Sequence, residues 1–459
     1  MVVENEISYS INFSQDLLYI ILDSYISKKF QVFQEYDDFV DENNVRTRRS
    51  ADNTFTSVTK TCTDLKKFVY ANGDVLIPFV DRCSVEEPAS GASPLLNRIV
   101  RCVVFKSKER PEFEIKFEHV YFNKSLIDKF DSLMASKQIA LINLLQNKNE
   151  KLIRESHLGS DEILAAIRLE YEYENDTIDY AVLDYMCDVI KEIDAIAEYQ
   201  NISPLLPYTT LQNNIIYRKF EDEKLLNTIN DGDDNDVYKW AMKLDGVRGR
   251  GFCTKNFMIV FMDDMQMFSN TMDSKIFKLN NVVAFQCELI DKTLYITDLL
   301  HVFKYNYNNR TQYEISMDPY EIAANDAVDS INYLAQKFNS GAASPICLKT
   351  MTNECVTLKF QQFFDPPIMQ NGYSTMPTDG FVVLDSQMRY VKYKHVKTVE
   401  VECDAESAQF NNLEGPLYRA NTKISPAVMP IQHGAIYEAI VTDDAIEIIK
   451  RRPDRLVPN

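Results

Sequence analysis

The residue pattern with the clearest chemical content lies in the middle of the chain. It has the form K-x-D-G-x-R and consists of Lys243, Asp245, Gly246 and Arg248. A lysine amine attacks phosphorus only when it is deprotonated, so its neighbours must favour the neutral form. Arg248 and later lysines supply cationic neighbours. The pattern therefore offers one amine nucleophile, one carboxylate and one guanidinium at a fixed spacing, the groups that an attack on the α-phosphorus of a nucleoside triphosphate would need.

Further charged residues follow in order on predicted strands. Glu288 lies in AFQCELI and Asp298 in LYITDLL, segments rich in β-branched or aromatic residues that predict buried strands. A lone acid on such a strand is also consistent with a hydrogen-bonded structural position. Asp379 stands in a turn before an apolar strand, and the alternation RYVKYK points Lys392 and Lys394 to one face. Alone, that face also fits a solvated strand surface.

In this order, the motifs resemble those of the covalent nucleotidyltransferase superfamily of mRNA capping guanylyltransferases and polynucleotide ligases. The resemblance covers roughly residues 235–459 and implies a lysyl-nucleotide intermediate on Lys243. It implies that Arg248 and Glu288 hold the ribose, and that Asp379 helps to bind the catalytic metal. The implied nucleotide-binding residues are Asp245, Gly246, Arg248, Glu288, Asp298, Asp379, Lys392, Lys394, Arg452, Asp454 and Arg455.

The C-terminal end, RPDRLVPN from Arg452, resembles the closing motif of capping guanylyltransferases on an OB-type domain. The resemblance implies that Arg452, Asp454 and Arg455 orient the departing pyrophosphate. Two positions depart from the family pattern. Gln286-Cys287 stands where Asp-Gly usually precedes the glutamate, which affects a secondary contact, and Arg455 replaces a lysine, which keeps the charge but changes its geometry.

The N-terminal half carries a different pattern, in which acids alternate along predicted strands. Glu4 and Glu6 are two residues apart, and Arg168, Glu170 and Glu172 repeat that spacing. Residues two apart on a strand share one face. Such a face is either an edge strand whose charges meet water, or a site for a hard divalent cation that takes oxygen ligands, such as Mg²⁺ or Mn²⁺.

Glutamate strands interleaved with strands of Arg and Lys resemble the triphosphate tunnel metalloenzymes, in which an antiparallel barrel closes around a triphosphate. The resemblance implies that Glu4, Glu6, Glu170 and Glu172 bind the metal ion. The implied triphosphate-binding residues are Arg46, Arg48, Glu86, Lys116, Arg168 and Glu174.

The two patterns together, from the ENEISYSINF start to the Pro-Asn end, resemble the baculovirus late expression factor four family. That resemblance implies a capping-enzyme subunit of the viral late RNA polymerase. RNA 5′ ends would be the substrate, the other polymerase subunits would be partners, and the nucleus of the infected cell would be the location. None of these features follows from composition.

Composition limits the class of protein. A chain of 459 residues suggests two to four domains, and the longest apolar run near its start, at 17–22, predicts neither a signal peptide nor a membrane span. Nine cysteines without a C-x-x-C pair indicate free thiols in a reducing compartment, and five scattered histidines give no zinc pattern. The net charge of −19 argues against a general nucleic-acid coat, but allows an RNA end held in a cationic tunnel.

The expected fold class is α+β in three domains. A triphosphatase domain over 1–225 would be an antiparallel β-barrel with flanking helices. A nucleotidyltransferase domain over 226–396 would contain antiparallel sheets, and an OB-type barrel would cover 397–459. The first boundary is expected near the acidic stretch 231–236 and the second after Lys394. Helical spacing predicts helices at 14–29, with Ser14 as cap, at 125–145 and at 178–197.

The sequence favours a bifunctional mRNA capping enzyme, in which a metal-dependent RNA 5′-triphosphatase is joined to a GTP:RNA guanylyltransferase. One alternative is a polynucleotide ligase with a lysyl-AMP intermediate, which the terminal motif and the glutamate strands disfavour. The other is a noncatalytic polymerase subunit that retains the motifs. The intact Lys243 with its full set of phosphate ligands argues against that.

Overall fold

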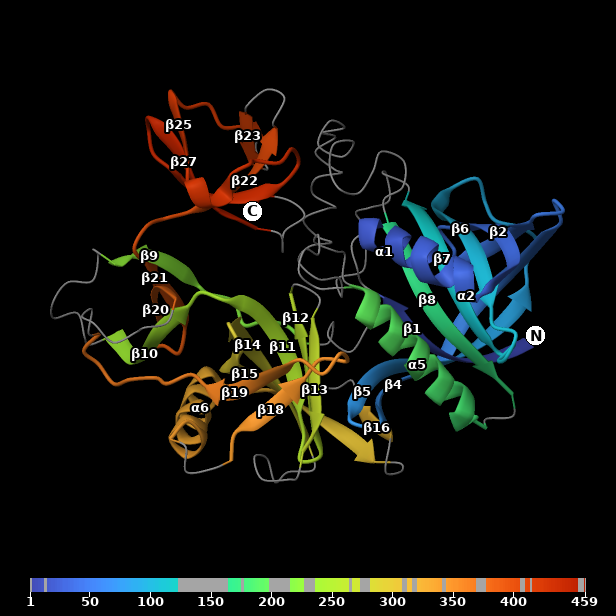
Figure 1. Ribbon diagram of the computed structural model, residues 1–459, viewed down its shortest axis with the longest axis horizontal. Helices are drawn as coiled ribbons and strands as arrows, with labels where there is room; N and C mark the ends of the chain where they lie inside the picture. The colour runs from blue at the N-terminus through green and yellow to red at the C-terminus, as the bar shows by residue number, and fades with distance from the viewer. Residues whose placement is uncertain are drawn as a thin grey trace. The chain divides into compact units, whose positions relative to one another are not determined.

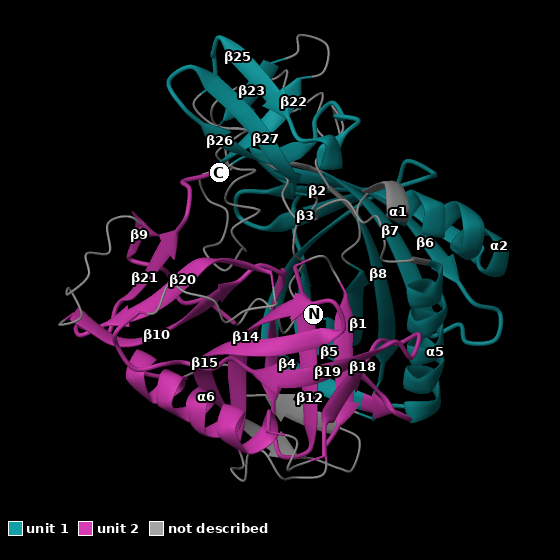
Figure 2. Ribbon diagram, turned by 60° about the vertical axis from the view of Figure 1, so that its left-hand side comes forward, with its two compact units in different colours: residues 1–70, 77–213, 399–459 teal, residues 71–76, 214–398 magenta. Residues whose placement is uncertain are grey.

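A computed structural model gives the arrangement of the chain (Figure 1). It describes residues 2–11, 15–122, 164–174, 177–197, 215–226, 236–263, 266–272, 281–307, 312–315, 320–340, 344–368, 377–404, 409–412, 415–452 and 458. The chain forms two compact units, shown in Figure 2. Unit 1 contains residues 1–70, 77–213 and 399–459, and unit 2 contains residues 71–76 and 214–398. No helix in the described ranges is both long and apolar enough to cross a membrane.

Eight antiparallel strands in the N-terminal part of the chain close into a barrel, which confirms the predicted barrel. Their order is β1-β5-β4-β3-β2-β6-β7-β8, and β8 pairs back onto β1. The strands are β1 (Val2–Ile11), β2 (Gln31–Asp41), β3 (Val45–Ser50), β4 (Phe55–Asn72), β5 (Val75–Pro88), β6 (Leu96–Lys106), β7 (Phe113–Phe122) and β8 (Leu164–Tyr173).

The two faces of this barrel differ in chemistry. Helices lie against the outside of the barrel in Figure 1. Apolar strand residues such as Ile7, Ile115 and Leu169 are fully buried, as expected for the face that helices cover. The residues that alternate with them carry charges and line the inner face, among them Glu6 and Glu170. Small barrels usually fill their interior with apolar side chains. Here the interior is instead suited to hold a charged ligand.

Two helical segments cover the outer face. The first runs from α1 (Gln15–Ile21) through a π turn (Leu22–Ile26) to α2 (Ser27–Lys29). The second is α5 (Tyr180–Ala197), where the Asp179 carboxylate accepts a hydrogen bond from Ala181 N at 2.9 Å. These helices confirm the predictions at 14–29 and 178–197. Ser14, the predicted helix at 125–145 and most of the stretch 231–236 lie outside the described residues.

Unit 2 is built around two sheets. The larger contains β11 (Val247–Cys253), β12 (Phe257–Met262), β13 (Met267–Thr271), β14 (Asn281–Ile290), β15 (Thr293–Tyr307), β18 (Ile346–Lys349) and β19 (Cys355–Phe360). Helix α6 (Ala324–Phe338) packs its buried residues into the same core. The smaller sheet has the order β10 (Val237–Leu244), β20 (Thr378–Asp385), β21 (Tyr390–Lys394) and β9 (Asp222–Leu225).

The described strand pairs of this region are antiparallel, as predicted, except for two. β15 pairs with β19 in parallel, and β21 pairs with β9 in parallel. Parallel neighbours need a long connection, which α6 and the intervening segment provide between β15 and β19. Every predicted strand that carries a candidate residue in this unit is a strand, including those of Glu288, Asp298 and Lys392.

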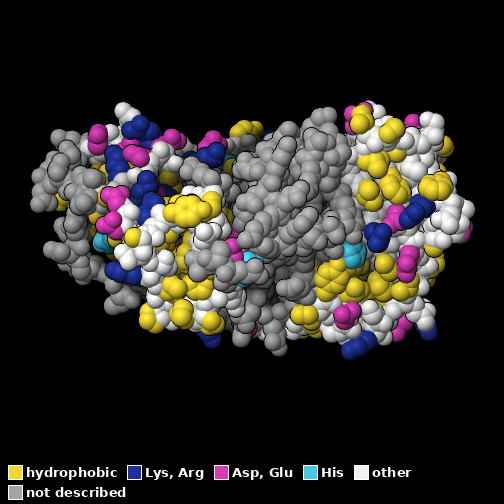
Figure 3. Space-filling view, turned by 90° about the horizontal axis from the view of Figure 1, so that it is seen from above, with side chains coloured by type: hydrophobic (Ala, Val, Ile, Leu, Met, Phe, Trp, Pro, Cys, Tyr) yellow, Lys and Arg dark blue, Asp and Glu magenta, His cyan; other side chains and the backbone are white. Residues whose placement is uncertain are grey.

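The last part of the chain forms a six-stranded sheet of its own. Its order is β24 (Gly415–Pro416), β23 (Gln409–Asn412), β22 (Val399–Asp404), β26 (Ile436–Val441), β27 (Ala445–Arg451) and β25 (Asn421–Ile424). Val401, Tyr437 and Ile448 are at its buried core. The OB-type closure of this sheet stays a prediction. On the face in Figure 3, acidic, basic and hydrophobic side chains are interspersed over the described residues.

Candidate active sites

Lys243 is the second-last residue of β10 and lies beside two other candidate residues. Its Nζ lies 3.3 Å from Asp379 Oδ2, and Lys394 Nζ lies 3.5 Å from the same oxygen. Lys243 comes from β10, Asp379 from β20 and Lys394 from β21, which are consecutive strands of the smaller sheet. The structure therefore brings the predicted nucleophile, the predicted metal-binding acid and a predicted phosphate-binding lysine to one carboxylate.

Two glycines make this arrangement possible. A Cβ on Gly246 would lie 2.3 Å from the carbonyl oxygen of Leu289, so the turn after Lys243 can approach β14 only with glycine. Gly380 has φ +87°, and a Cβ there would lie 1.9 Å from the carbonyl oxygen of Tyr393. Gly246 thus keeps the turn after the nucleophile against the sheet, and Gly380 keeps Asp379 close to Lys394.

Arg248 and Glu288 face each other on adjacent strands, β11 and β14. Burial raises the pKa of Glu288 to about 7, against the opposing charges of Arg248 and Lys243. Asp263 and Asp245 raise it further. Glu288 therefore lies within electrostatic range of the whole K-x-D-G-x-R motif, as a ribose-binding residue of the same site would.

The two lysines of β21 have different partners. Lys394 contacts Asp379, whereas Lys392 Nζ lies 2.6 Å from Glu223 Oε2 on β9. Although burial acts to raise the pKa of Glu223, the hydrogen bond and charge of Lys392 lower it. Lys392 also lies 5.7 Å from the ring centroid of Phe220. Lys392, a predicted phosphate-binding residue, is thus paired with an acid that lies upstream of the lysine motif.

Asp298 is engaged elsewhere in unit 2. Its Oδ2 accepts a hydrogen bond from Arg218 Nε at 2.9 Å, and the Arg218 guanidinium also donates to the carbonyl oxygens of Leu299 and Ile322. Burial raises the pKa of Asp298 to about 6, although Arg218 opposes the shift. Among the described residues, no ion pair joins Asp298 to the Lys243 cluster. Its placement fits a structural carboxylate.

The terminal motif is described only at Arg452. Arg452 Nη1 lies 3.0 Å from Glu400 Oε1 and 3.8 Å from Glu438 Oε2, within the C-terminal sheet. Asp454 and Arg455 lie outside the described residues. The predicted role of this motif at the pyrophosphate stays a prediction.

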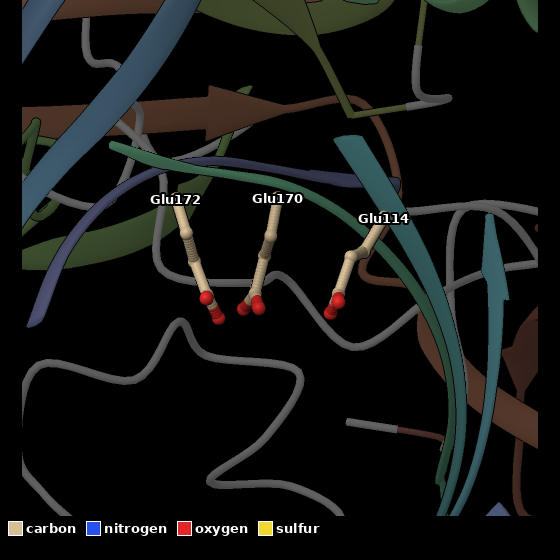
Figure 4. Close-up of side chains that lie close together, drawn as sticks. All are labelled: Glu114, Glu170 and Glu172. Carbon is tan, nitrogen blue, oxygen red and sulfur yellow. The ribbon is translucent and has the colours of Figure 1, made fainter. Parts of the chain in front are cut away.

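The second candidate site is the inner face of the barrel. Glu6 lies opposite Glu172 on the paired strands β1 and β8, and the ligand atoms of Glu114, Glu170 and Glu172 lie within 4.8 Å of one another. These three side chains point the same way in Figure 4. Burial raises the pKa of Glu172, and the charges of Glu114, Glu4 and Glu170 add to that shift against Lys116. A bound cation would stabilise the charged form of such a cluster by offsetting the repulsion between its carboxylates.

Cations balance part of this negative charge. Lys60 Nζ lies 2.6 Å from Glu4 Oε2 and 3.3 Å from Glu6 Oε2. Arg168 Nη1 lies 2.9 Å from Glu170 Oε1, and Lys116 pairs with the same carboxylate. Although burial acts to raise it, the charges of Arg168 and Lys116 hold the pKa of Glu170 well below its usual range.

The remaining predicted tunnel residues are also in ion pairs or at the barrel end. Arg46 Nη2 lies 2.8 Å from Glu86 Oε1. Arg48 makes two contacts with Asp38, at 2.8 and 2.9 Å, and its guanidinium lies 3.5 Å from the Tyr36 ring centroid. Glu174 follows the end of β8 with an exposed side chain.

Sequence reasoning assigned no role to several residues that complete the two sites. Glu114 stands two residues before Lys116, and Arg82 stands four residues before Glu86. Strand periodicity could therefore have placed each of them on the same face as a predicted site residue. Arg82 Nη1 lies 2.5 Å from Glu6 Oε1. Lys60, Tyr217 and Asp263 carry no local signal, because they meet their partners only through the tertiary structure.

Comparison with known proteins gives matches over the whole chain. A model of the late expression factor 4 (LEF-4) family matches residues 4–459. A protein of Autographa californica nuclear polyhedrosis virus named mRNA capping enzyme LEF-4 is 47% identical over 472 residues, which cover 100% of this chain and 99% of that protein. Its namesake from Orgyia pseudotsugata multicapsid polyhedrosis virus is 41% identical over 467 residues, covering 100% and 98%.

Solved structures give a more distant match. A structure of the S. pombe Pct1 RNA triphosphatase aligns with 42% of this chain and 84% of its own, at 12% identity and a TM-score of 0.24.

Proposed function

Because the chain belongs to the late expression factor 4 family, we propose that it is an mRNA capping enzyme that acts twice on the same RNA end. The barrel removes the γ-phosphate from RNA 5′-triphosphate ends. Unit 2 then transfers GMP from GTP to the resulting 5′-diphosphate. The observation that carries this proposal is the identity of 47%, over the full length, to a protein named as an mRNA capping enzyme.

In the transfer reaction, Lys243 is the nucleophile. Its Nζ forms a bond to the α-phosphorus of GTP, the bond to the β-phosphate oxygen breaks, and pyrophosphate leaves. A terminal oxygen of the RNA 5′-diphosphate then attacks the same phosphorus and the P–N bond breaks, which frees the lysine. Lys392 and Lys394 hold the negative charge of the α-phosphate. Arg248 and Glu288 hold the ribose.

In the triphosphatase reaction, the inner face of the barrel would hold both the RNA end and a divalent cation. Glu114, Glu170 and Glu172 offer only oxygen donors, which suits Mg²⁺ or Mn²⁺, and Glu4 and Glu6 complete the acidic set. The cation would supply charge neutralisation at the γ-phosphate and lower the pKa of a bound water. Further phosphate charge would be held by the barrel cations Arg46, Arg48, Lys60, Lys116 and Arg168.

Covalent labelling tests the transfer proposal. The protein is incubated with α-labelled GTP or ATP and Mg²⁺, then separated by denaturing electrophoresis. We expect a GMP adduct that Lys243→Ala abolishes, because no other group replaces the nucleophile, while phosphate release from triphosphate-ended RNA stays near the wild-type rate. Labelling by ATP alone would identify a ligase. Labelling that persists in Lys243→Ala would remove the assignment.

The reverse variant tests the barrel. Glu172→Ala removes one carboxylate from the acidic cluster, so phosphate release should fall by a factor of about 100 or more. GTP labelling of Lys243 should persist, which shows that unit 2 is folded, and an unchanged far-ultraviolet circular dichroism spectrum would show the same for the barrel. If the glutamates were only a solvated strand face, alanine would leave phosphate release and its metal dependence unchanged.

The family also suggests where the enzyme works. We propose that it acts in the nucleus of the infected host cell as a subunit of the viral late RNA polymerase. Its partners there would be the other polymerase subunits and the nascent RNA 5′ end. Copurification of the tagged full-length chain with polymerase subunits from infected nuclei tests this. A tagged chain that copurifies with none of them would contradict it.

A further inference from the structure

A segment upstream of the lysine motif contacts three of the candidate nucleotide-binding residues. This segment comprises residues 215–226 and belongs to unit 2. Tyr217 lies against Arg248, Arg218 holds Asp298, and Glu223 pairs with Lys392. Its backbone is fixed as well, because Arg250 Nη1 donates to the carbonyl oxygen of Ile215 at 2.9 Å. The 215–226 segment is therefore part of the framework of the nucleotide site.

The contact at Arg248 is a closed triangle of three side chains. Arg248 Nε and Nη2 each lie 2.9 Å from Asp263 Oδ2. The Arg248 guanidinium carbon lies 4.2 Å from the ring centroid of Tyr217, and Tyr217 Oη donates to Asp263 Oδ1 at 3.1 Å. Each of the three side chains thus contacts the other two, which fixes the plane and the direction of the guanidinium.

The backbone places Asp263 for this role. Asp263 follows β12, the neighbour of β11, and its amide N donates to the carbonyl oxygen of Arg248 at 2.7 Å. Arg248 nevertheless keeps 36% of its side chain exposed. Two of the five guanidinium donors are directed at Asp263, and no described residue takes the other three, which leaves them for a ligand.

We propose that Tyr217 and Asp263 are positioning residues that hold Arg248 for the ribose of the bound nucleotide. This inference rests on the proposed function, since it concerns the nucleotide that Lys243 attacks. An arginine held in one rotamer before binding loses less conformational freedom when the nucleotide arrives, and its remaining donors meet the ribose hydroxyls in a fixed direction. Loss of either partner should therefore weaken recognition of the ribose more than chemistry at phosphorus.

The test compares GTP with 2′-deoxy-GTP and 3′-deoxy-GTP as labelling substrates for the full-length chain. In Asp263→Asn and Tyr217→Leu, we expect KM for GTP to rise about 10-fold with little change in the maximal labelling rate. The preference for GTP over at least one deoxynucleotide should shrink by a similar factor. General damage to the fold would instead lower labelling from all three nucleotides equally.

Two conservative variants keep the test decisive. Tyr217→Phe retains the ring under Arg248, and Asp263→Glu retains the carboxylate. The KM for GTP of each should therefore lie between that of the wild type and that of the disruptive variant at the same position. Asp385→Asn is the matched control, because Asp385 Oδ2 contacts Arg389 Nε at 2.9 Å and Nη2 at 2.8 Å, the same type of pair, away from Lys243. It should label like the wild type.

The possible outcomes are distinct. If the wild-type chain forms no GMP adduct, the proposed transfer function fails. If it forms the adduct, but Asp263→Asn and Tyr217→Leu keep the wild-type KM and the wild-type preference for GTP, the positioning role is overturned. Equal losses with GTP and with both deoxynucleotides would also overturn it.

Discussion

At the residue scale, one of the two lysines proposed to bind phosphate already has an anionic partner. Lys392 Nζ lies 2.6 Å from Glu223 Oε2, and both side chains are about one-quarter exposed, at 28% and 26%. A phosphate that binds Lys392 must compete with this carboxylate. We therefore expect Glu223 to lower the affinity for nucleotide while it keeps the lysine oriented.

This competition gives a prediction for Glu223→Gln. Removing the carboxylate charge should lower KM for GTP in the labelling reaction by about 2- to 5-fold, the size expected from a partly exposed ion pair of up to about 1 kcal/mol. Steady labelling rates against GTP concentration measure it. Asp222→Asn is the matched control, because Asp222 precedes Glu223 on β9 and faces the other way. A KM for Glu223→Gln at or above that of the wild type would contradict the prediction.

Residue types and their spacing were enough to predict which charged residues share a strand face, but not which partners those residues contact. The pairs Glu4/Glu6 and Glu170/Glu172 were recognisable because strand periodicity is a local property. The partners of Arg248 were not, because Tyr217 and Asp263 reach it from different directions along the chain and neither stands in a motif. Asp298 shows the converse case, since its local pattern does not reveal that Arg218 holds it.

At the element scale, α5 carries one acid into the apolar layer on the barrel. Asp194 is 7% exposed, and its Oδ2 has no hydrogen-bond partner among the described residues. Burial raises its pKa to about 7. The folded state therefore binds this proton more tightly than the unfolded state does, and stability falls as the pH rises from about 4 to about 7.

Asp194→Asn should remove this loss. The difference between the free energy of unfolding of the variant and that of the wild type should rise by up to about 4 kcal/mol from about pH 4 to pH 8. Urea denaturation at the two pH values measures the difference. Asp188→Asn on the same helix is the control, because Asp188 is 66% exposed and should show no such widening. Parallel curves for Asp194→Asn and the wild type would exclude a buried, neutral carboxyl.

Elements were predictable to different degrees. Helix α5 has apolar residues at helical spacing, including Leu183, Met186, Ile190 and Ile193, and its prediction is confirmed. The parallel pairing of β9 with β21 was not predictable, because these strands are far apart in the sequence and nothing local specifies their neighbours. The π turn within the first helical segment likewise has no signal in the apolar pattern.

At the scale of the whole molecule, the two candidate sites lie in different units, so each should work without the other. A mixture of Lys243→Ala and Glu172→Ala proteins should cap triphosphate-ended RNA, because the 5′-diphosphate made by the first can diffuse to the second. Neither variant alone should do so. Cap formation from labelled GTP measures the outcome.

The control for the mixture is diphosphate-ended RNA. Glu172→Ala alone should cap that RNA at the wild-type rate, since the triphosphatase step is bypassed. If the mixture fails on triphosphate ends while this control succeeds, the intermediate does not leave the protein that made it, and the two sites act only within one chain.

The 215–226 segment has a consequence for how such a protein can be recombined. Its position before the lysine motif invites a junction near residue 225 when the halves of two relatives are exchanged. A chimera joined there would combine Tyr217 and Glu223 of one parent with Asp263 and Lys392 of the other. A junction upstream of residue 215 avoids this, because both residues of each contact then come from the same parent.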